Sequence, residues 1–382
     1  MIYLDNNATT RPAPEVVAAM APFLTEIYGN PSSAHELGRA ARQAVERARE
    51  AVAALLGAAD PGEIVFTSGG TESDNWAITA ALSRANSRHI ITTQVEHEAV
   101  RNLADRLENE SVRVTRLGVD ELGNIDLEQL RSELFPESTV VSVMHANNET
   151  GVLFPIREIA SIVKEHSRAL VHVDGVNAAG KIPIDLKGSE IDLYSISGHK
   201  FHGPKGIGAL YVRSGVEILP WFRGGEQESG KRAGTEAVHQ IAGLGAAAEL
   251  VQDMRAMERV RGLRNELESR VLESIPNSRV NGDRNPERRL PNTSNISFEN
   301  ANGEVIMARL NDMGIYVSTG SACASADHTA SPVLQAMEVP YSYAAGSIRF
   351  SLGRYNEMSE IEAVLECLPQ IVGDLRRMAA AG

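Results

Sequence analysis

The chain has 382 residues, a length that predicts about two domains at roughly 150 residues each. With 43% hydrophobic residues it is too apolar for a disordered chain, and its net charge of −13 argues against direct binding to nucleic acid. Its two cysteines, Cys323 and Cys367, are too few for a disulfide scaffold. The sequence shows neither a signal peptide nor a long apolar run, so we expect a cytoplasmic protein that does not enter a membrane.

From about residue 60 onward, short apolar runs alternate with amphipathic stretches. Strands are predicted at 64–67, 89–93, 139–144, 169–173, 191–196 and 207–212. Helices are predicted at 71–83, 97–108 and 156–166. This alternation is typical of βαβ units and predicts an α/β fold built on a mostly parallel sheet.

The C-terminal part of the chain has a different pattern. A long helical stretch, roughly 233–273, is followed by strands at 295–298 and 347–350 and by helices at 303–312 and 359–378. This mixture predicts a smaller α+β domain that the N-terminal segment completes. We therefore assign residues 16–256 to a large domain, and residues 1–15 and 257–382 to a small one.

A glycine-containing turn joins the first predicted strand to the first predicted helix. Gly69 and Gly70 allow a tight turn, so that backbone N–H groups and the helix N-terminus can bind one anion such as a phosphate. Thr71 adds a hydroxyl donor. The turn alone fits a simple helix cap equally well, because such caps need no ligand.

An acid, Asp174, ends the apolar run 169–173. In an open α/β sheet this places a carboxylate at the edge where ligands bind, and such a carboxylate can pair with a protonated ring nitrogen. An aspartate that merely starts a turn is the alternative for this motif taken alone.

The third motif is a lysine that follows the strand predicted at 191–196. Lys200 lies among glycines and two histidines, unlike most surface lysines. A desolvated lysine lowers its pKa readily and then suits Schiff-base chemistry, whereas a solvated loop lysine does not. The anion-binding turn, the acid at the strand end and the lysine together favour a Schiff-base enzyme.

Seven segments in chain order resemble the NifS/IscS-like cysteine desulfurases, pyridoxal-phosphate (PLP) enzymes of the class V aminotransferase family. The segments are YLDNNATT (3–10), SGGTESDN (68–75), EH (96–97), NNETG (147–151), SGHK (197–200), RAGT (232–235) and SIRFSL (347–352). The resemblance implies a fold-type I transferase. Such a transferase has a large domain with a mostly parallel seven-stranded sheet flanked by helices, and a smaller α+β domain.

The resemblance also assigns roles around PLP. Lys200 would hold PLP as a Schiff base and move a substrate proton, Asp174 would pair with the ring nitrogen, and His97 would stack on the ring and shuttle a proton. A solvent-facing residue at a helix start is the alternative for His97. Further contacts to PLP are implied for Gly70, Thr71, Asn148, Asn177, Ser197 and His199, and for Thr235 from the second subunit.

Two further residues would handle the substrate. Arg349 lies in an apolar strand pattern, where its guanidinium suits the carboxylate of an amino acid, although a structural salt bridge is the alternative. Asn148 would help to bind that carboxylate. Cys323, in a small and polar loop at about 319–332, would accept sulfur as a persulfide; without the resemblance it would be an incidental thiol. Cys367 lies in an amphipathic helical pattern and is expected to pack.

Two positions depart from the family pattern. Asn177 replaces the usual Gln, so its contact with PLP could be direct, water-mediated or lost. Gly175 replaces the more usual Ala, which would leave more room beside the ring or a looser strand end.

The resemblance implies a homodimeric cysteine desulfurase. It would convert L-cysteine to L-alanine and pass the sulfur to an iron–sulfur scaffold or a sulfur-carrier protein. No resident metal is expected, although Cys323 could contact an iron–sulfur cluster during transfer. The alternatives are a selenocysteine lyase or another class V enzyme, and a sulfur-delivery adaptor without catalysis.

Overall fold

The computed structural model describes residues 1–85, 88–319 and 330–381. Its main strands are β2 (Ile64–Thr67), β3 (His89–Thr93), β4 (Arg113–Leu117), β5 (Val140–Met144), β6 (Leu170–Asp174), β7 (Leu193–Ser197) and β8 (Gly208–Val212). They form one seven-stranded sheet in the order β2-β8-β7-β6-β5-β3-β4. Within it only β8 runs antiparallel to its neighbours, which confirms the predicted α/β fold with a mostly parallel sheet.

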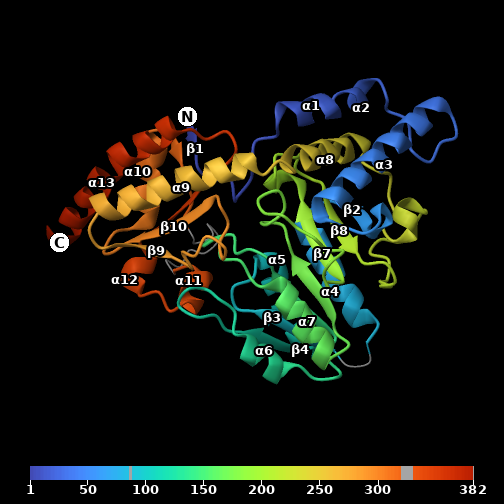
Figure 1. The fold of residues 1–382 in the computed structure, drawn as a ribbon, viewed down its shortest axis with the longest axis horizontal. Helices are drawn as coiled ribbons and strands as arrows, with labels where there is room; N and C mark the ends of the chain where they lie inside the picture. Colours follow the sequence, from blue (N-terminus) through green and yellow to red (C-terminus); the bar gives the residue numbers. More distant parts are fainter. Residues whose placement is uncertain (86–87, 320–329, 382) are drawn as a thin grey trace.

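Helices cover both faces of this sheet (Figure 1). They are α1 (Pro14–Met20), α2 (Pro22–Thr25), α3 (Glu36–Leu56), α4 (Gly70–Ser83), α5 (Glu98–Asn109), α6 (Leu127–Glu133), α7 (Ile156–His166) and α8 (Val238–Val251). Alternate strand residues point to opposite faces. Ile64 and Phe66 therefore join the core under α3, α7 and α8, whereas Val65 packs with Trp76 of α4.

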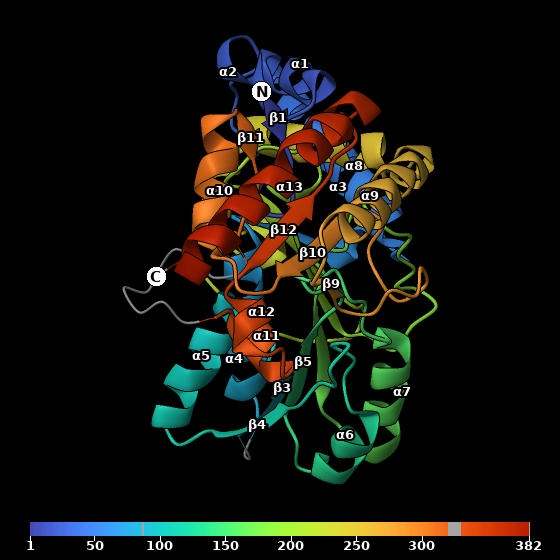
Figure 2. The ribbon, with the colours of Figure 1, turned by 90° about the vertical axis from the view of Figure 1, so that its left-hand side faces the viewer.

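A second core lies among the C-terminal elements. These are α9 (Arg255–Ser274), β9 (Ser278–Asn281), β10 (Thr293–Phe298), α10 (Gly303–Asp312), β11 (Ile315–Tyr316), α11 (Pro332–Ala336), α12 (Tyr341–Ala344), β12 (Ser347–Ser351) and α13 (Met358–Ala381). An antiparallel sheet has the order β12-β10-β9, and α9 and α13 pack side by side near it (Figure 2). The N-terminal strand β1 (Ile2–Tyr3) pairs in parallel with β11, so the start of the chain joins this region.

The structure differs from the predicted elements at several places, and it includes a 21-residue helix, α3, that was not predicted. A single helical stretch over 233–273 is wrong, because α8 ends at Val251 and α9 begins at Arg255. The Asp253 carboxylate accepts a hydrogen bond from the backbone N–H of Arg255 and so favours a new helix start. Strand β4 was not predicted, because its residues are mostly charged or polar and only partly buried.

One C-terminal segment packs away from its neighbours in sequence. Ala330, Val333, Leu334 and Met337 belong to the core of the large sheet, not to the second core. This contact returns the chain to the sheet directly after residues 320–329. Among the described helices, none is long and apolar enough to cross a membrane.

Candidate active site

The carboxyl ends of the central parallel strands open into one cavity of about 230 Å³. Its lining residues come from β6, β7, the start of α4 and the N-terminal segment, as expected for ligand sites in open α/β sheets. They include nine of the residues singled out in the sequence, namely Gly70, Thr71, His97, Asn148, Asp174, Asn177, Ser197, His199 and Lys200. Ala8, Asp74, Met144, Ala146 and Val176 complete the lining.

One end of the cavity is built for an anion. Gly69 has a φ of 153°, a backbone conformation that favours glycine, and it lets α4 begin at Gly70. The first N–H groups of a helix have no partner within the helix and carry partial positive charge. Ser197 and His199 lie at the same cavity, and burial, with Lys200 nearby, lowers the pKa of His199 to about 4.

Lys200 lies in the short 3-10 turn Gly198–Lys200 that follows β7. Its Nζ donates hydrogen bonds to the backbone carbonyl oxygens of Asn7 and Ala8. Burial lowers its pKa to about 8, and the nearby Arg349 acts in the same direction. An appreciable fraction of this amine is therefore uncharged near neutral pH, as a nucleophilic lysine requires.

The opposite end of the cavity is rich in buried carboxylates. Asp174 ends β6 and accepts a hydrogen bond from the N–H of Val176 at 2.9 Å. Burial raises its pKa to about 6, with a further contribution from Asp74. Burial also raises the pKa of Asp74 to about 7 and that of Glu96 to about 8. One oxygen of each of these two neighbours has no hydrogen-bond partner in the part of the chain that the structure describes.

A buried histidine lies close to these carboxylates within the sheet. His172 lies two residues earlier on β6, and its two ring nitrogens hydrogen-bond the hydroxyls of Ser142 and Ser195. Its Nε2 is also 3.5 Å from Asp74 Oδ1. Because burial lowers the pKa of His172 to about 4, this ring is neutral near pH 7 and does not neutralise the carboxylates.

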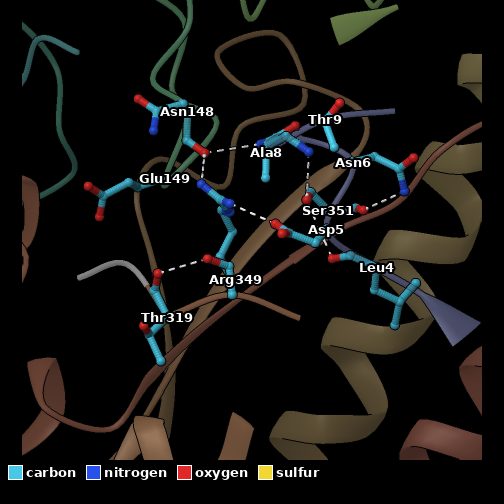
Figure 3. A network of polar contacts seen from close by, with 12 residues as sticks. Leu4, Asp5, Asn6, Ala8, Thr9, Asn148, Glu149, Thr319, Arg349 and Ser351 are labelled. Carbon is cyan, nitrogen blue, oxygen red and sulfur yellow. Dashed lines mark hydrogen bonds and ion pairs between the residues drawn. The ribbon is translucent and has the colours of Figure 1, made fainter. Parts of the chain in front are cut away.

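Arg349 of β12 does not itself line the cavity, but it contacts Asn148, which does (Figure 3). Its Nη2 pairs with Asp5 Oδ1 at 2.7 Å, and its Nη1 donates to the backbone oxygen of Asn148 at 3.1 Å. Arg349 is only 6% exposed, yet its Nε has no partner among the described residues. The Arg349 guanidinium group therefore forms the structural salt bridge and still has one N–H donor that is unpaired within the described residues.

His97 and Asn177 line the cavity and also form hydrogen bonds within the chain. His97 is the N-cap of α5, where its Nδ1 accepts a hydrogen bond from the N–H of Ala99 at 3.1 Å. The alternative of a helix-start residue is thus correct as to position, but the residue also lines the cavity. Asn177 donates to the backbone oxygen of Asn147 and accepts from Lys181, a residue that the sequence analysis did not select.

The space beside Asp174 is filled. A Cβ built on Gly175 would lie 1.9 Å from Cε1 of Tyr194, and the Tyr194 hydroxyl hydrogen-bonds His145 Nδ1 at 2.8 Å. The expectation of extra room or a looser strand end at Gly175 is therefore wrong. The buried Tyr194 ring takes the place of the missing methyl group.

One predicted cofactor contact is missing from this cavity. Thr235 is exposed and does not line the cavity of this single chain. Cys323 and most of the predicted 319–332 loop lie outside the described residues. Cys367 is buried in the second core, where burial raises its pKa. In the part of the chain that the structure describes, no cluster of histidine, cysteine and acidic side chains could hold a metal ion.

The site also contains residues that sequence reasoning missed. Asp5 and Asn7 lie in the quoted N-terminal segment, and Asp74 and Glu96 in two other quoted segments, but none received a role. The sequence feature that could have pointed to them is that each is a polar or charged residue within a segment that resembles the family. Lys181 lies four residues after Asn177, which is one helical turn, and this spacing was its only signal.

Comparison with known proteins agrees with this geometry. Residues 2–364 match the family model described as aminotransferase class-V. The chain belongs to the class V aminotransferase family. Within it, the chain is 53% identical over 382 residues to a cysteine desulfurase of Trichormus azollae, covering 99% of this chain and 94% of that protein.

Solved structures give the same result. A NifS-like protein superimposes with a TM-score of 0.91 at 39% identity, covering 98% of this chain and 99% of the other. SspA in complex with cysteine gives a TM-score of 0.83 at 34% identity over 94% of this chain and all of its own. The chain is thus a member of the NifS-like cysteine desulfurases, and both this group and the wider class V family are PLP-dependent.

The cavity suits PLP on its own chemistry. At one end it offers helix N–H groups and hydroxyls for a phosphate, and at the other it holds Asp174 beside Asp74, whose Oδ1 has no hydrogen-bond partner among the described residues. Such an uncompensated acidic end favours a cationic ring nitrogen. Lys200 supplies the amine between these two ends.

Proposed function

We propose that this protein is a PLP-dependent cysteine desulfurase that converts L-cysteine to L-alanine and keeps the sulfur as a persulfide on Cys323. The observation that carries the proposal is the cavity that combines an amine of lowered pKa, a buried acid and an anion-binding turn. Similarity to cysteine desulfurases along nearly the whole chain supports the same reaction.

In this proposal, Lys200 holds PLP covalently and Asp174 pairs with its ring nitrogen. The phosphate group lies on the start of α4, with Ser197 and His199 as further donors. Thr71 adds its hydroxyl, and Asn148 and Asn177 complete the cradle. When bound, PLP supplies an electron sink that stabilises negative charge on the substrate carbon atoms.

The substrate carboxylate binds at Arg349, whose buried Nε has no partner within the described chain. A carboxylate there satisfies that donor and competes with Asp5 for the guanidinium group. Once free of its contacts with Asn7 and Ala8, the Lys200 amine removes the Cα proton of the substrate. His97 at the start of α5 moves a proton on the other side of the cavity.

The sulfur step uses the thiolate of Cys323. This thiolate attacks the substrate sulfur, an S–S bond forms, and the bond between Cβ and the sulfur breaks. The electron pair of the broken bond remains with the carbon fragment, which takes up protons and leaves as alanine. No external oxidant is needed, because cysteine and the thiol yield alanine and the persulfide.

The molecular setting completes the proposal. The large domain spans residues 16–256, and the small domain spans residues 1–15 and 257–382 with the loop at about 319–332. Two chains form a homodimer, so that Thr235 of the partner subunit contributes to each site. The persulfide passes to an iron–sulfur scaffold or a sulfur-carrier protein in the cytoplasm.

Borohydride reduction followed by peptide mapping tests the cofactor site. The protein loaded with PLP should carry a pyridoxyl group on Lys200, and Lys200→Ala should carry none while it remains folded. Alanine release from L-cysteine should disappear in the same variant. A pyridoxyl group on another lysine would overturn the site assignment.

A further inference from the structure

Lys181 is a buried lysine that has no carboxylate partner among the described residues. The residue is only 5% exposed, and its Nζ donates to Asn177 Oδ1 at 2.6 Å and to Asn7 Oδ1 at 3.1 Å. Lysines are rarely buried unless they are paired, and even the half-buried Lys164 pairs with Asp192 at 2.6 Å. Because Lys181 bonds two amide oxygens instead of a carboxylate, its role is not to neutralise a buried acid.

The amine fixes the orientation of the Asn177 amide. A lysine donates through its N–H groups, so the amide oxygen of Asn177 must face Lys181 and the NH2 group must face away. One N–H of that group bonds the backbone oxygen of Asn147 at 3.3 Å. The other makes no contact within the described chain, and Asn177 lines the cavity, so this N–H is the donor available to a ligand.

The second contact extends to Lys200. Asn7 accepts from Lys181 with its side-chain oxygen, while its backbone oxygen accepts from Lys200 Nζ. Its own amide N–H groups go to the backbone oxygen of Asn148 and to the hydroxyl of Thr293. Lys181 thus shares the positioning of Asn7 with Asn292, which also donates to Asn7 Oδ1 at 3.0 Å, and it donates directly to the amide oxygen of Asn177.

We propose that Lys181 is a positioning residue of the active site, which orients the Asn177 amide so that its NH2 group donates into the PLP cavity. This inference rests on the proposed function, because it concerns the same cavity. It also gives the short Asn177 side chain a fixed direction, because a second side chain holds its amide oxygen.

The electrostatics agree with this role. Burial lowers the pKa of Lys181 well below its ordinary value, and the two facing cations, Lys200 and Arg349, act in the same direction. The short contact of 2.6 Å to Asn177 Oδ1 and the contact of 3.1 Å to Asn7 Oδ1 stabilise the buried amine in place of a carboxylate.

A double-mutant cycle with two readouts tests the inference. PLP is added to the wild type, Lys181→Met, Asn177→Ala and the double variant. The dissociation constant for PLP and the pH midpoint of the visible absorption of the bound form are then measured. Each single variant should bind PLP roughly tenfold more weakly, which is the order expected for one lost hydrogen bond to a polar ligand.

The absorption midpoint should rise in both single variants, because a lost N–H donor no longer stabilises the deprotonated form, in which the phenolic oxygen of PLP carries more charge. The double variant should shift no further than either single one, since both changes remove the same donor. Lys181→Gln retains two amide donors and should show a smaller shift. If Lys181→Met does not fold, this variant and Asn177→Ala carry the test.

The matched control is Lys164→Met, which removes a lysine from a pair distant from the cavity. It should lower thermal stability but leave the PLP affinity and the absorption midpoint unchanged. A wild type that takes up no PLP would overturn both proposals. A wild type that desulfurates cysteine, while Lys181→Met keeps its affinity and midpoint, would overturn this inference alone.

Discussion

The amine of Lys200 combines burial with nearby charges of both signs. Burial and Arg349 lower its pKa to about 8, while Asp174 and Asp5 act against them. An amine attacks a carbonyl group only when it is uncharged, so pH controls how fast the lysine can react.

We therefore expect the ligand-free protein to take up PLP at a rate that rises with pH through a midpoint near 8. Stopped-flow measurement of the visible absorption at several pH values gives this midpoint. Arg349→Ala should move it upward, because that variant removes a neighbouring positive charge. A midpoint near that of an ordinary lysine, at about 10.4, would contradict the described environment.

Glu96 is a second residue whose surroundings fix its charge. Its Oε1 accepts from the Thr93 hydroxyl and the N–H of Met144, whereas its Oε2 is buried and has no partner within residues 1–85, 88–319 and 330–381. Burial raises its pKa to about 8, and Asp174 and Asp74 add to the shift. Near pH 7 the folded chain therefore keeps this side chain protonated.

This shift links stability to pH. In the unfolded chain a glutamate titrates near 4.3, so between that value and about 8 the folded state holds a proton that the unfolded state lacks. Stability consequently falls as the pH rises through this window. Glu96→Gln mimics the protonated form and should be more stable than the wild type by a few kcal/mol at pH 8, since each pKa unit corresponds to about 1.4 kcal/mol.

Urea unfolding of the ligand-free proteins at pH 5 and pH 8 measures this difference. The variant should match the wild type more closely at pH 5, where Glu96 is protonated in the folded state. An equal difference at both pH values would show that Glu96 is charged in the folded protein.

At the scale of elements, the residue that follows β6, Gly175, packs closely against the Tyr194 ring of β7. Val173 and Tyr194 are register partners, and the Tyr194 ring lies where a side chain at residue 175 would begin. Gly175→Ala should therefore destabilise the protein by about 2 kcal/mol, the order found for overpacked cores. Thermal unfolding of Gly175→Ala, of Tyr194→Leu and of the double variant measures the effect. The double variant should recover part of the loss, and strictly additive losses would argue against this steric account.

The elements predicted from the sequence are mainly those in which apolar residues recur with the spacing of a strand or of a helix from end to end. Strands such as β2 and β3 are fully buried and appeared as short strand-like runs, and the helix α5 that follows β3 appeared as an amphipathic stretch. Strand β4 was missed because it carries Arg113 and Arg116. The break between α8 and α9 was missed because one aspartate within a polar stretch gives little signal.

The site was predictable for a similar reason. Asp174 ends one buried strand and Lys200 follows another after a short turn. Their positions in the chain therefore predicted that both lie at the same edge of the sheet. The contacts of Lys181 were not predictable, because a lysine in a short turn is normally exposed. Only the packing of the N-terminal segment over that turn buries it.

At the scale of the whole molecule, the N-terminal segment joins the two cores at the site. Asp5 pairs with Arg349 of β12, and Asn7 contacts Lys181, Lys200 and Asn148 near the large sheet. These contacts join residues more than 100 positions apart, and no local pattern in the sequence predicts them. The substrate site therefore depends on both cores at once.

The central claim is that Lys200 and Cys323 act in sequence on L-cysteine. The most direct measurement incubates the PLP-loaded wild type, Lys200→Ala and Cys323→Ala with L-cysteine, and follows alanine together with the mass of the peptide that contains Cys323. The wild type should release alanine and gain one sulfur atom on Cys323. Both variants should lose nearly all alanine release, and Cys323→Ala should still bind PLP. Full alanine release by Cys323→Ala, or a wild type without added sulfur on that peptide, would contradict the account.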